Sequence, residues 1–167
     1  MLSLYLLRHG KSDWNAESFS DHDRPLAPRG RRGARRMGRF LSDLAEQPDA
    51  VVSSTALRAR ATAELAAEEG AWTCPIRLTE DLYLPAPGAL LAQARAQDRA
   101  VNRLLLVGHE PTWSEAVARF AGGGQVRMVT AALARLDFSV TDWSRVDFGQ
   151  ATLAWMITPK LLAAGME

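Results

Sequence analysis

Short apolar runs that alternate with longer amphipathic stretches are the feature that most constrains the fold of this chain. The runs at 2–7, at 49–54 ("DAVVSS") and at 103–107 ("RLLLV") are typical of strands that are buried on both faces of a sheet. The stretches 26–45 and 57–69 between them have the pattern of helices. This alternation predicts an α/β fold, a three-layer α/β/α sandwich around a mostly parallel central sheet.

The remainder of the chain continues the alternation to its end. Further elements are expected as a short strand near Ile76, helices over 90–96 and from Pro111 to the glycines of 121–124, and closing strands over 131–138 and 151–157. No internal repeat, low-complexity tract or long linker interrupts them. We therefore expect residues 1–167 to form a single domain.

Composition limits the class of protein and its partners. Hydrophobic residues make up 47% and charged residues 23% of the 167 positions, and the net charge is +1. No global electrostatic field therefore favours nucleic acid or an anionic membrane as a partner. The opening "MLSLYLLRHG" lacks the basic start of a signal peptide, and no apolar run approaches the roughly 20 residues of a membrane helix. The single cysteine, Cys74, cannot form an internal disulfide, so we expect a cytoplasmic protein.

Basic side chains follow three of the predicted strands. Arg8 and His9 end the first strand, Arg58 lies four residues after the second, and His109 follows the strand that begins at Arg103. Because the carboxyl ends of parallel strands meet at one edge of a sheet, we expect these side chains to gather there.

Two guanidiniums beside two imidazoles suit a tetrahedral oxyanion, most simply phosphate. Arginine offers a planar fork of charged donors, and histidine can act as a nucleophile or a proton carrier. Nearby arginines also favour the neutral imidazole, which is the form that can attack phosphorus. A helix opened by Pro111 would add the positive end of its dipole. A lone histidine at a strand end is usually structural, but four such residues at equivalent positions favour a phosphate site.

The segments that carry these residues resemble the histidine phosphatase superfamily, also called phosphoglycerate-mutase-like. They occur in order as "LLRHGKSDWN", "RPLAPRG", "SSTALRARATAE" and "LLLVGHEP". The resemblance implies the phosphoglycerate-mutase-like fold and a phosphatase without a metal or organic cofactor. It also implies a role for individual residues: His9 as the nucleophile that becomes phosphorylated, Arg8 and Arg58 as holders of the phosphoryl group, His109 as a second contact to its oxygens, and Asn15 near the phosphate.

The chain length and the opening "LYLLRHGKSDW" resemble the SixA-type phosphohistidine phosphatases within this superfamily. The connection between the strands at Ile76 and Arg103 leaves little room for an insertion that would roof the site. An open site would suit a phosphohistidine on another protein. Two alternatives stay open, a phosphatase of small phosphomonoesters and a non-catalytic module that binds phosphoproteins.

The predicted site also needs a general acid if the substrate is a phosphate ester. Hydrolysis of an ester expels an alkoxide that must be protonated, and Glu80 and Asp81 in "RLTEDLYLP" are the candidate acids. The same two residues are equally explained as solvated acids on a loop. Phosphohistidine needs such an acid less, because free imidazole has a pKa of only about 6.5.

Two further segments carry unusual charge. The arginines of "RGRRGARRMGR", from Arg29 to Arg39, could guide an acidic partner protein or bind nucleic acid, although a solvated helix face is the simpler interpretation. The absence of interleaved aromatic residues disfavours nucleic acid. "SDHDRP" is interpreted as a polar loop at the rim of the site and not as a metal site.

Overall fold

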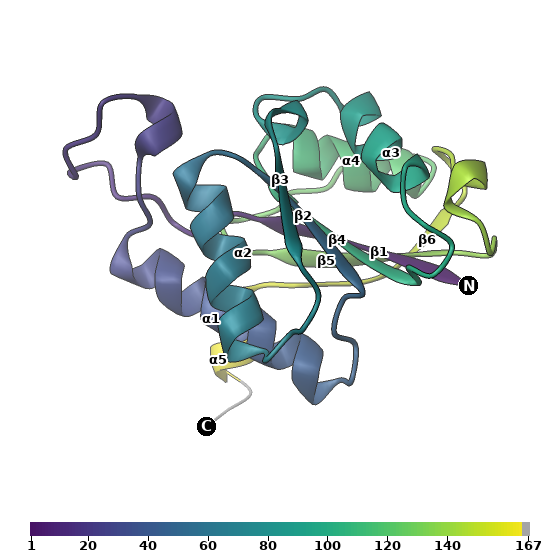
Figure 1. Ribbon diagram of the computed structural model, residues 1–167, viewed down its shortest axis with the longest axis horizontal. Coiled ribbons are helices and arrows are strands. Elements are labelled where there is room, and N and C mark those ends of the chain that lie inside the picture. The colour runs from purple at the N-terminus through teal and green to yellow at the C-terminus, as the bar shows by residue number, and fades with distance from the viewer. Residues whose placement is uncertain (165–167) are drawn as a thin grey trace.

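A six-stranded sheet with helices on both faces forms the protein, as the computed structural model of residues 1–164 shows (Figure 1). The strand order is β3-β2-β4-β1-β5-β6. The strands are β1 (Leu2–Arg8), β2 (Ala50–Ser54), β3 (Ile76–Thr79), β4 (Arg103–Gly108), β5 (Leu133–Phe138) and β6 (Ala151–Ile157). The helices are α1 (Pro28–Asp43), α2 (Leu57–Glu69), α3 (Pro87–Arg95), α4 (Thr112–Phe120) and α5 (Pro159–Ala164), with 3-10 turns η1 (Asp21–Asp23), η2 (Glu80–Leu82) and η3 (Trp143–Arg145).

The predicted three-layer α/β/α arrangement is confirmed. Alternate side chains of β1 enter two separate cores, because successive residues of a strand point to opposite faces. Leu4 and Leu6 pack in the core that includes residues of α3 and α4, whereas Tyr5 and Leu7 pack in the core that includes residues of α1 and α2. Burial on both faces explains why the first strand is an unbroken apolar run and not an alternating one.

Strands β1 to β4 are parallel, and β5 and β6 are antiparallel to their neighbours. The direction of β5 is set by the segment 121–132. This segment returns the chain to the carboxyl edge of the parallel strands, since Leu133 at the start of β5 pairs with Leu7 near the end of β1. The same segment therefore brings its last residues to the edge where the basic side chains were predicted.

The predicted element boundaries differ from the observed ones by a few residues. The first helix was expected over 26–45 and runs over Pro28–Asp43, and α3 begins at Pro87, three residues before the predicted start. Pro111 is the N-cap of α4 and not its first helical residue. Within residues 1–164, no helix is long and apolar enough to cross a membrane.

Helices α1 and α2 approach each other closely at Gly38. A Cβ atom at this position would lie 2.0 Å from the backbone oxygen of Ala66. Ala66 belongs to the rigid backbone of α2, so neither helix can relieve the overlap without moving as a body.

We expect Gly38→Ala to lower the free energy of unfolding by roughly 2–3 kcal/mol, because overpacking outweighs the gain in helix propensity. Chemical denaturation monitored by circular dichroism measures the change. Gly88→Ala is the matched control, since a Cβ at Gly88 in α3 meets nothing within 4 Å. That variant should be neutral or more stable by up to about 1 kcal/mol. Equal effects of the two substitutions would contradict the steric explanation.

Candidate active site

The ends of three parallel strands bring the two predicted histidines together. The N–H of His9 donates to the carbonyl oxygen of Gly108 at 2.9 Å, which places His9 beside His109. The centroids of the two imidazole rings are 5.2 Å apart. From the end of β2, the hydroxyl of Ser54 lies 2.8 Å from Nε2 of His109. The three strand ends therefore meet at one edge of the sheet.

The tautomer of His9 is fixed by its own loop. Nδ1 of His9 lies 2.7 Å from the carbonyl oxygen of Gly10, and a carbonyl can only accept, so Nδ1 carries the proton. Nε2 is left with a free lone pair. Burial, with smaller contributions from the charges of Arg58 and Arg8, lowers the pKa of His9 to about 4. At neutral pH, His9 is therefore an uncharged base whose Nε2 is able to act as a nucleophile.

The guanidinium groups of Arg8 and Arg58 donate hydrogen bonds to backbone carbonyl groups. Nη1 of Arg8 donates to the carbonyl oxygen of Met128 at 2.8 Å, and Nη1 of Arg58 donates to that of Asp21 at 2.7 Å. Arg8 directly precedes His9 in the chain, and the charges of both arginines lower the pKa of the imidazole. These contacts fix the guanidinium planes while the Nε groups remain buried without a partner among residues 1–164.

Arg24 is a third arginine of the site, which the sequence analysis did not identify. Its charge also lowers the pKa of His9, and its Nε is likewise buried without a partner among the described residues. The guanidinium stacks over the ring of Trp14 at 3.6 Å. The available signal was its position as the first residue of "RPLAPRG", the segment that links the first strand to the first helix.

Asp21 connects the two arginines that come from outside the strands. Its carboxylate accepts from Arg24 at 2.7 Å, from Arg58 at 3.0 Å and from the hydroxyl of Tyr83 at 3.1 Å. Partial burial acts to raise the pKa of Asp21, but the charge of Arg58, the hydrogen bond from Tyr83 and the contacts with Arg24 outweigh it and lower the pKa. The carboxylate therefore stays ionised and positions donors, and it is not a proton donor itself.

His109 presents Nδ1 as a further donor. The hydroxyl of Ser54 accepts the N–H of Ala56 at 3.2 Å and lies 2.8 Å from Nε2 of His109, to which it donates when Nε2 carries no proton. Nδ1 then carries the ring proton, and it is buried without a partner in the described part of the chain. Burial, together with the neighbouring His9 and Arg58, lowers the pKa of His109 to about 3.

Four buried donors thus belong to residues that either lower the pKa of His9 by their charge or lie beside its ring. They are the Nε groups of Arg8, Arg24 and Arg58 and Nδ1 of His109. Buried donors without a partner are rare in folded proteins and need an acceptor. Charged, forked donors of this kind suit the oxygens of a tetrahedral oxyanion.

The amino end of α4 contributes less positive potential than the sequence suggested. The carboxylate of Glu110 accepts the backbone N–H of Ser114 at 2.9 Å and its hydroxyl at 2.5 Å. A negative group therefore already occupies the first turn of this helix and offsets its dipole.

The remaining predicted residues are exposed, and their hydrogen bonds within residues 1–164 go to groups other than His9 and His109. Asn15 is exposed, and its backbone N–H donates to the carboxylate of Asp13. Glu80 is exposed on η2, and the carboxylate of Asp81 accepts from the amide of Gln93 at 3.2 Å. The roles of Asn15, Glu80 and Asp81 stay predictions. Among residues 1–164, no three histidine, cysteine or acidic side chains cluster as metal ligands would.

Comparison with known proteins agrees with this geometry. The family model described as histidine phosphatase superfamily (branch 1) matches residues 4–83, and the structure of the protein histidine phosphatase SixA complexed with tungstate aligns with a TM-score of 0.83. The chain belongs to the histidine phosphatase superfamily. That SixA chain is 25% identical, and the match covers 96% of this chain and 99% of SixA.

Two further similar proteins match smaller portions of this chain than SixA does. An uncharacterised protein of Mycobacterium tuberculosis is 44% identical over 108 residues, which is 65% of this chain and 65% of that relative's length. The alpha-ribazole phosphatase from Shigella flexneri is 18% identical with a TM-score of 0.66 over 95% of this chain and 97% of its own. That likeness shows the fold alone.

The two buried histidines of this superfamily member make stability depend on pH. Their pKa values in the folded chain are about 4 and about 3, below the ordinary value of 6.5. Between pH 7 and 5 the unfolded chain therefore binds more protons than the folded one. The free energy of unfolding therefore decreases as the pH is lowered from 7 to 5. We expect a loss of up to about 2 kcal/mol for each histidine.

Urea denaturation at pH 7 and pH 5 measures this loss. His109→Asn, whose side chain does not titrate, should lose about half of the pH dependence. A free energy of unfolding that is the same at both pH values would contradict the burial of two neutral imidazoles.

Proposed function

We propose that this histidine phosphatase hydrolyses phosphohistidine on a protein through a covalent intermediate on His9. The observation that carries the proposal is the lone pair on Nε2 of a neutral, buried His9, whose pKa is lowered by burial and by the charges of three arginines with buried Nε donors. A binding module would need the donors alone, whereas a nucleophile needs this tautomer and this protonation state.

In the first step, Nε2 of His9 forms a bond to phosphorus while the bond from phosphorus to the substrate nitrogen breaks in line. The electron pair of the broken bond stays on that nitrogen and leaves a neutral imidazole when the other ring nitrogen carries a proton. Arg8, Arg24 and Arg58 stabilise the charge on the transferred oxygens, because their donors are fixed before the reaction begins.

In the second step, water attacks phosphorus and the bond to Nε2 breaks. Its electron pair returns to Nε2, and both protons of the water leave with the phosphate, which releases one of them at neutral pH. The hydrogen bond from Nδ1 to Gly10 holds the ring proton of His9 in place throughout, so the histidine is regenerated in its starting tautomer.

The acids of the site support a phosphohistidine substrate over an ester. Asp21 is ionised and clamped by two arginines, and neither Glu80 nor Asp81 has a recorded contact with His9 or His109. An alkoxide leaving group would need a proton donor that these described carboxylates do not supply. A phosphohistidine whose other ring nitrogen already carries a proton leaves as neutral imidazole and needs no such donor. The SixA structure that this chain resembles is that of a protein histidine phosphatase, which agrees with this choice.

The surroundings of the site also suit a protein substrate. Trp14 is 69% exposed and Phe19 is fully exposed, and both lie on the connection that carries Arg24. Large aromatic side chains are enriched in protein interfaces. The connection between β3 and β4 borders the site through Tyr83, which contacts Asp21 and His109, while Leu90 and Leu91 of α3 are packed into the core.

A competition tests the proposed function. Purified protein and its His9→Ala variant are given a phosphohistidine-bearing protein domain and a panel of small phosphate esters, and phosphate release is timed without added metal. We expect fast release from the phosphohistidine domain that is abolished in the variant. A preference for an ester would make the protein a phosphatase of small phosphomonoesters. Binding of phosphate with no release from any substrate would make it a binding module.

A further inference from the structure

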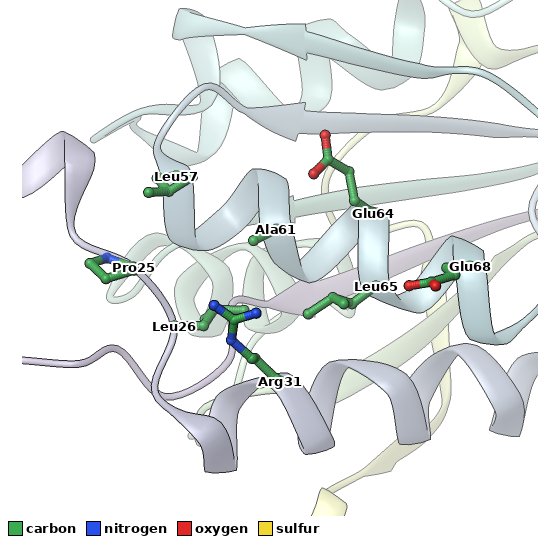
Figure 2. A pocket seen from close by; sticks show the side chains of 8 residues that line it. All are labelled: Pro25, Leu26, Arg31, Leu57, Ala61, Glu64, Leu65 and Glu68. Carbon is green, nitrogen blue, oxygen red and sulfur yellow. The ribbon is translucent and has the colours of Figure 1, made fainter.

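The arginines of α1 divide into groups with different surroundings. Figure 2 shows Arg31 pointing from α1 toward α2, in a hollow whose wall also carries Glu64 and Glu68. Arg35 pairs with Glu68 at 3.1 Å, and Arg39 pairs with Glu69 at 2.8 Å. Arg35 and Arg39 therefore form ion pairs with acidic residues of α2, and Arg31 shares its hollow with Glu64 and Glu68.

The other arginines of α1 line a different hollow, of about 550 Å³, between α1, residues 129–131 and α5. Two of them, Arg32 and Arg36, also border a neighbouring hollow that carries Asp43 and Glu69. We define the cationic hollow by its five basic residues, which are Lys11, Arg29, Arg32, Arg36 and Lys160. Within residues 1–164, none of the five forms an ion pair with a carboxylate. The only hydrogen bond recorded for them in that part of the chain runs from Arg36 to the carbonyl oxygen of Pro159 at 3.4 Å.

This concentration of charge is not a property of the whole surface. The chain has a net charge of +1, so everything outside these five residues sums to −4. The five positive charges that line the hollow, without a carboxylate partner among residues 1–164, can steer and orient a negatively charged partner.

The cationic hollow adjoins the active site through shared backbone. Lys11 follows the His9–Gly10 pair directly, and its carbonyl oxygen accepts the N–H of Ala27 at 2.8 Å just before α1. On the opposite wall, the N–H of Ala131 donates to the carbonyl oxygen of His9 at 3.0 Å. Met128, which holds Arg8, is the residue immediately before this wall. A partner whose phosphoryl group reaches His9 can therefore also cover the hollow.

We propose that the cationic hollow docks an acidic segment of the protein that carries the phosphohistidine. This inference rests on the proposed function and adds the recognition of the substrate by charge outside the phosphoryl group. An acidic peptide segment suits the hollow better than a nucleic acid, because no aromatic side chain from the described part of the chain lines it for base stacking.

Two synthetic peptides test the proposal. Both carry the same phosphohistidine, with flanking aspartate and glutamate in one and asparagine and glutamine in the other. We expect the wild-type chain to prefer the acidic peptide about tenfold in kcat/KM at low salt, and to lose the preference in 0.5 M salt. The double variant Arg29→Glu/Arg32→Glu should lose the preference at low salt and keep its activity on the neutral peptide.

The matched control is Arg99→Glu/Arg145→Glu, which changes the charge equally at the opposite edge of the sheet. Arg145 lies in the connection from β5 to β6, and Phe138 at the end of β5 pairs with Leu2 at the amino end of β1. The control should keep the preference for the acidic peptide. An equal loss in the two double variants, or a preference that survives Arg29→Glu/Arg32→Glu, would overturn the proposal.

Binding of the unphosphorylated acidic peptide, followed by fluorescence anisotropy, separates this proposal from the proposed function. Binding that depends on Arg29 and Arg32 without any dephosphorylation would support the docking surface and refute the phosphohistidine phosphatase. Dephosphorylation of both peptides at equal rates, with no such binding, would support the phosphatase and refute the docking surface. Tighter binding of a short single-stranded RNA than of the acidic peptide would also refute it.

Discussion

His9→Asn is expected to lower the turnover of a phosphohistidine substrate by at least about 10⁴-fold, because it removes the atom that forms the bond to phosphorus. Asparagine is smaller than histidine and can still hydrogen-bond locally, so the buried position remains polar. The arginine donors keep their backbone anchors at Met128 and Asp21. Binding of inorganic phosphate should therefore fall far less than turnover does.

Two measurements separate this outcome from a folding defect. Circular dichroism should show the same secondary structure in the variant and the wild type. Brief incubation with labelled substrate, quenched in alkali, should leave phosphate on the wild-type chain in a form that is lost in acid, and the variant should hold none. Retention of more than about 1% of the turnover would mean that water attacks the substrate directly, with His9 in another role.

Arg58→Ala is expected to lower kcat/KM by about 10³-fold, at the upper end of the range for the loss of a transition-state donor. The side chain is 4% exposed, approaches His9 closely enough to lower its pKa, and holds the carboxylate of Asp21 at 3.0 Å. Its removal takes away a positive charge and also frees Asp21 from one of the groups that keep it ionised. Arg24, which shares that carboxylate, should lose alignment as well.

The geometry of the donors and the charge itself can be tested separately at this position. Arg58→Lys keeps the charge but not the planar fork, so it should recover only part of the activity. Arg60→Ala is the matched control on the same helix, since Arg60 is exposed and, among residues 1–164, pairs with Glu64 alone. Its kcat/KM should stay within about twofold of the wild type. Full activity of Arg58→Lys would show that a point charge suffices and that the hydrogen-bond geometry does not matter.

Local pattern was enough to predict the sheet and the centre of the site. Apolar runs specify buried strands, and parallel strands end at one edge, so residues distant in sequence could be placed together from pattern alone. The structure brings His9 and His109 side by side and places Arg8 and Arg58 close to them. Helix boundaries were less certain because proline and glycine mark them only approximately.

The acids of the site could not be placed in the same way. Glu80 and Asp81 lie at a plausible distance along the chain, but η2 buries Leu82 and leaves both carboxylates exposed. Tyr83, one residue further, is the side chain that reaches Asp21. A shift of one or two residues in a short turn decides which side chain enters a site, and no periodic pattern records that shift.

The sequence by itself determined the succession of six strands and four helices along the chain and the residues at the strand ends, since both follow from local hydrophobic pattern and from the rule for parallel strands. The order of the strands within the sheet and the short helix α5 came only from the structure. Tertiary structure alone decided the parts of the site that come from irregular backbone. Asp21 and Arg24 lie on the connection between β1 and α1, and their positions depend on contacts with Arg58 and Tyr83 from other parts of the chain. The division of the α1 arginines into paired and unpaired groups has the same origin, because it depends on which neighbour packs against each face of the helix.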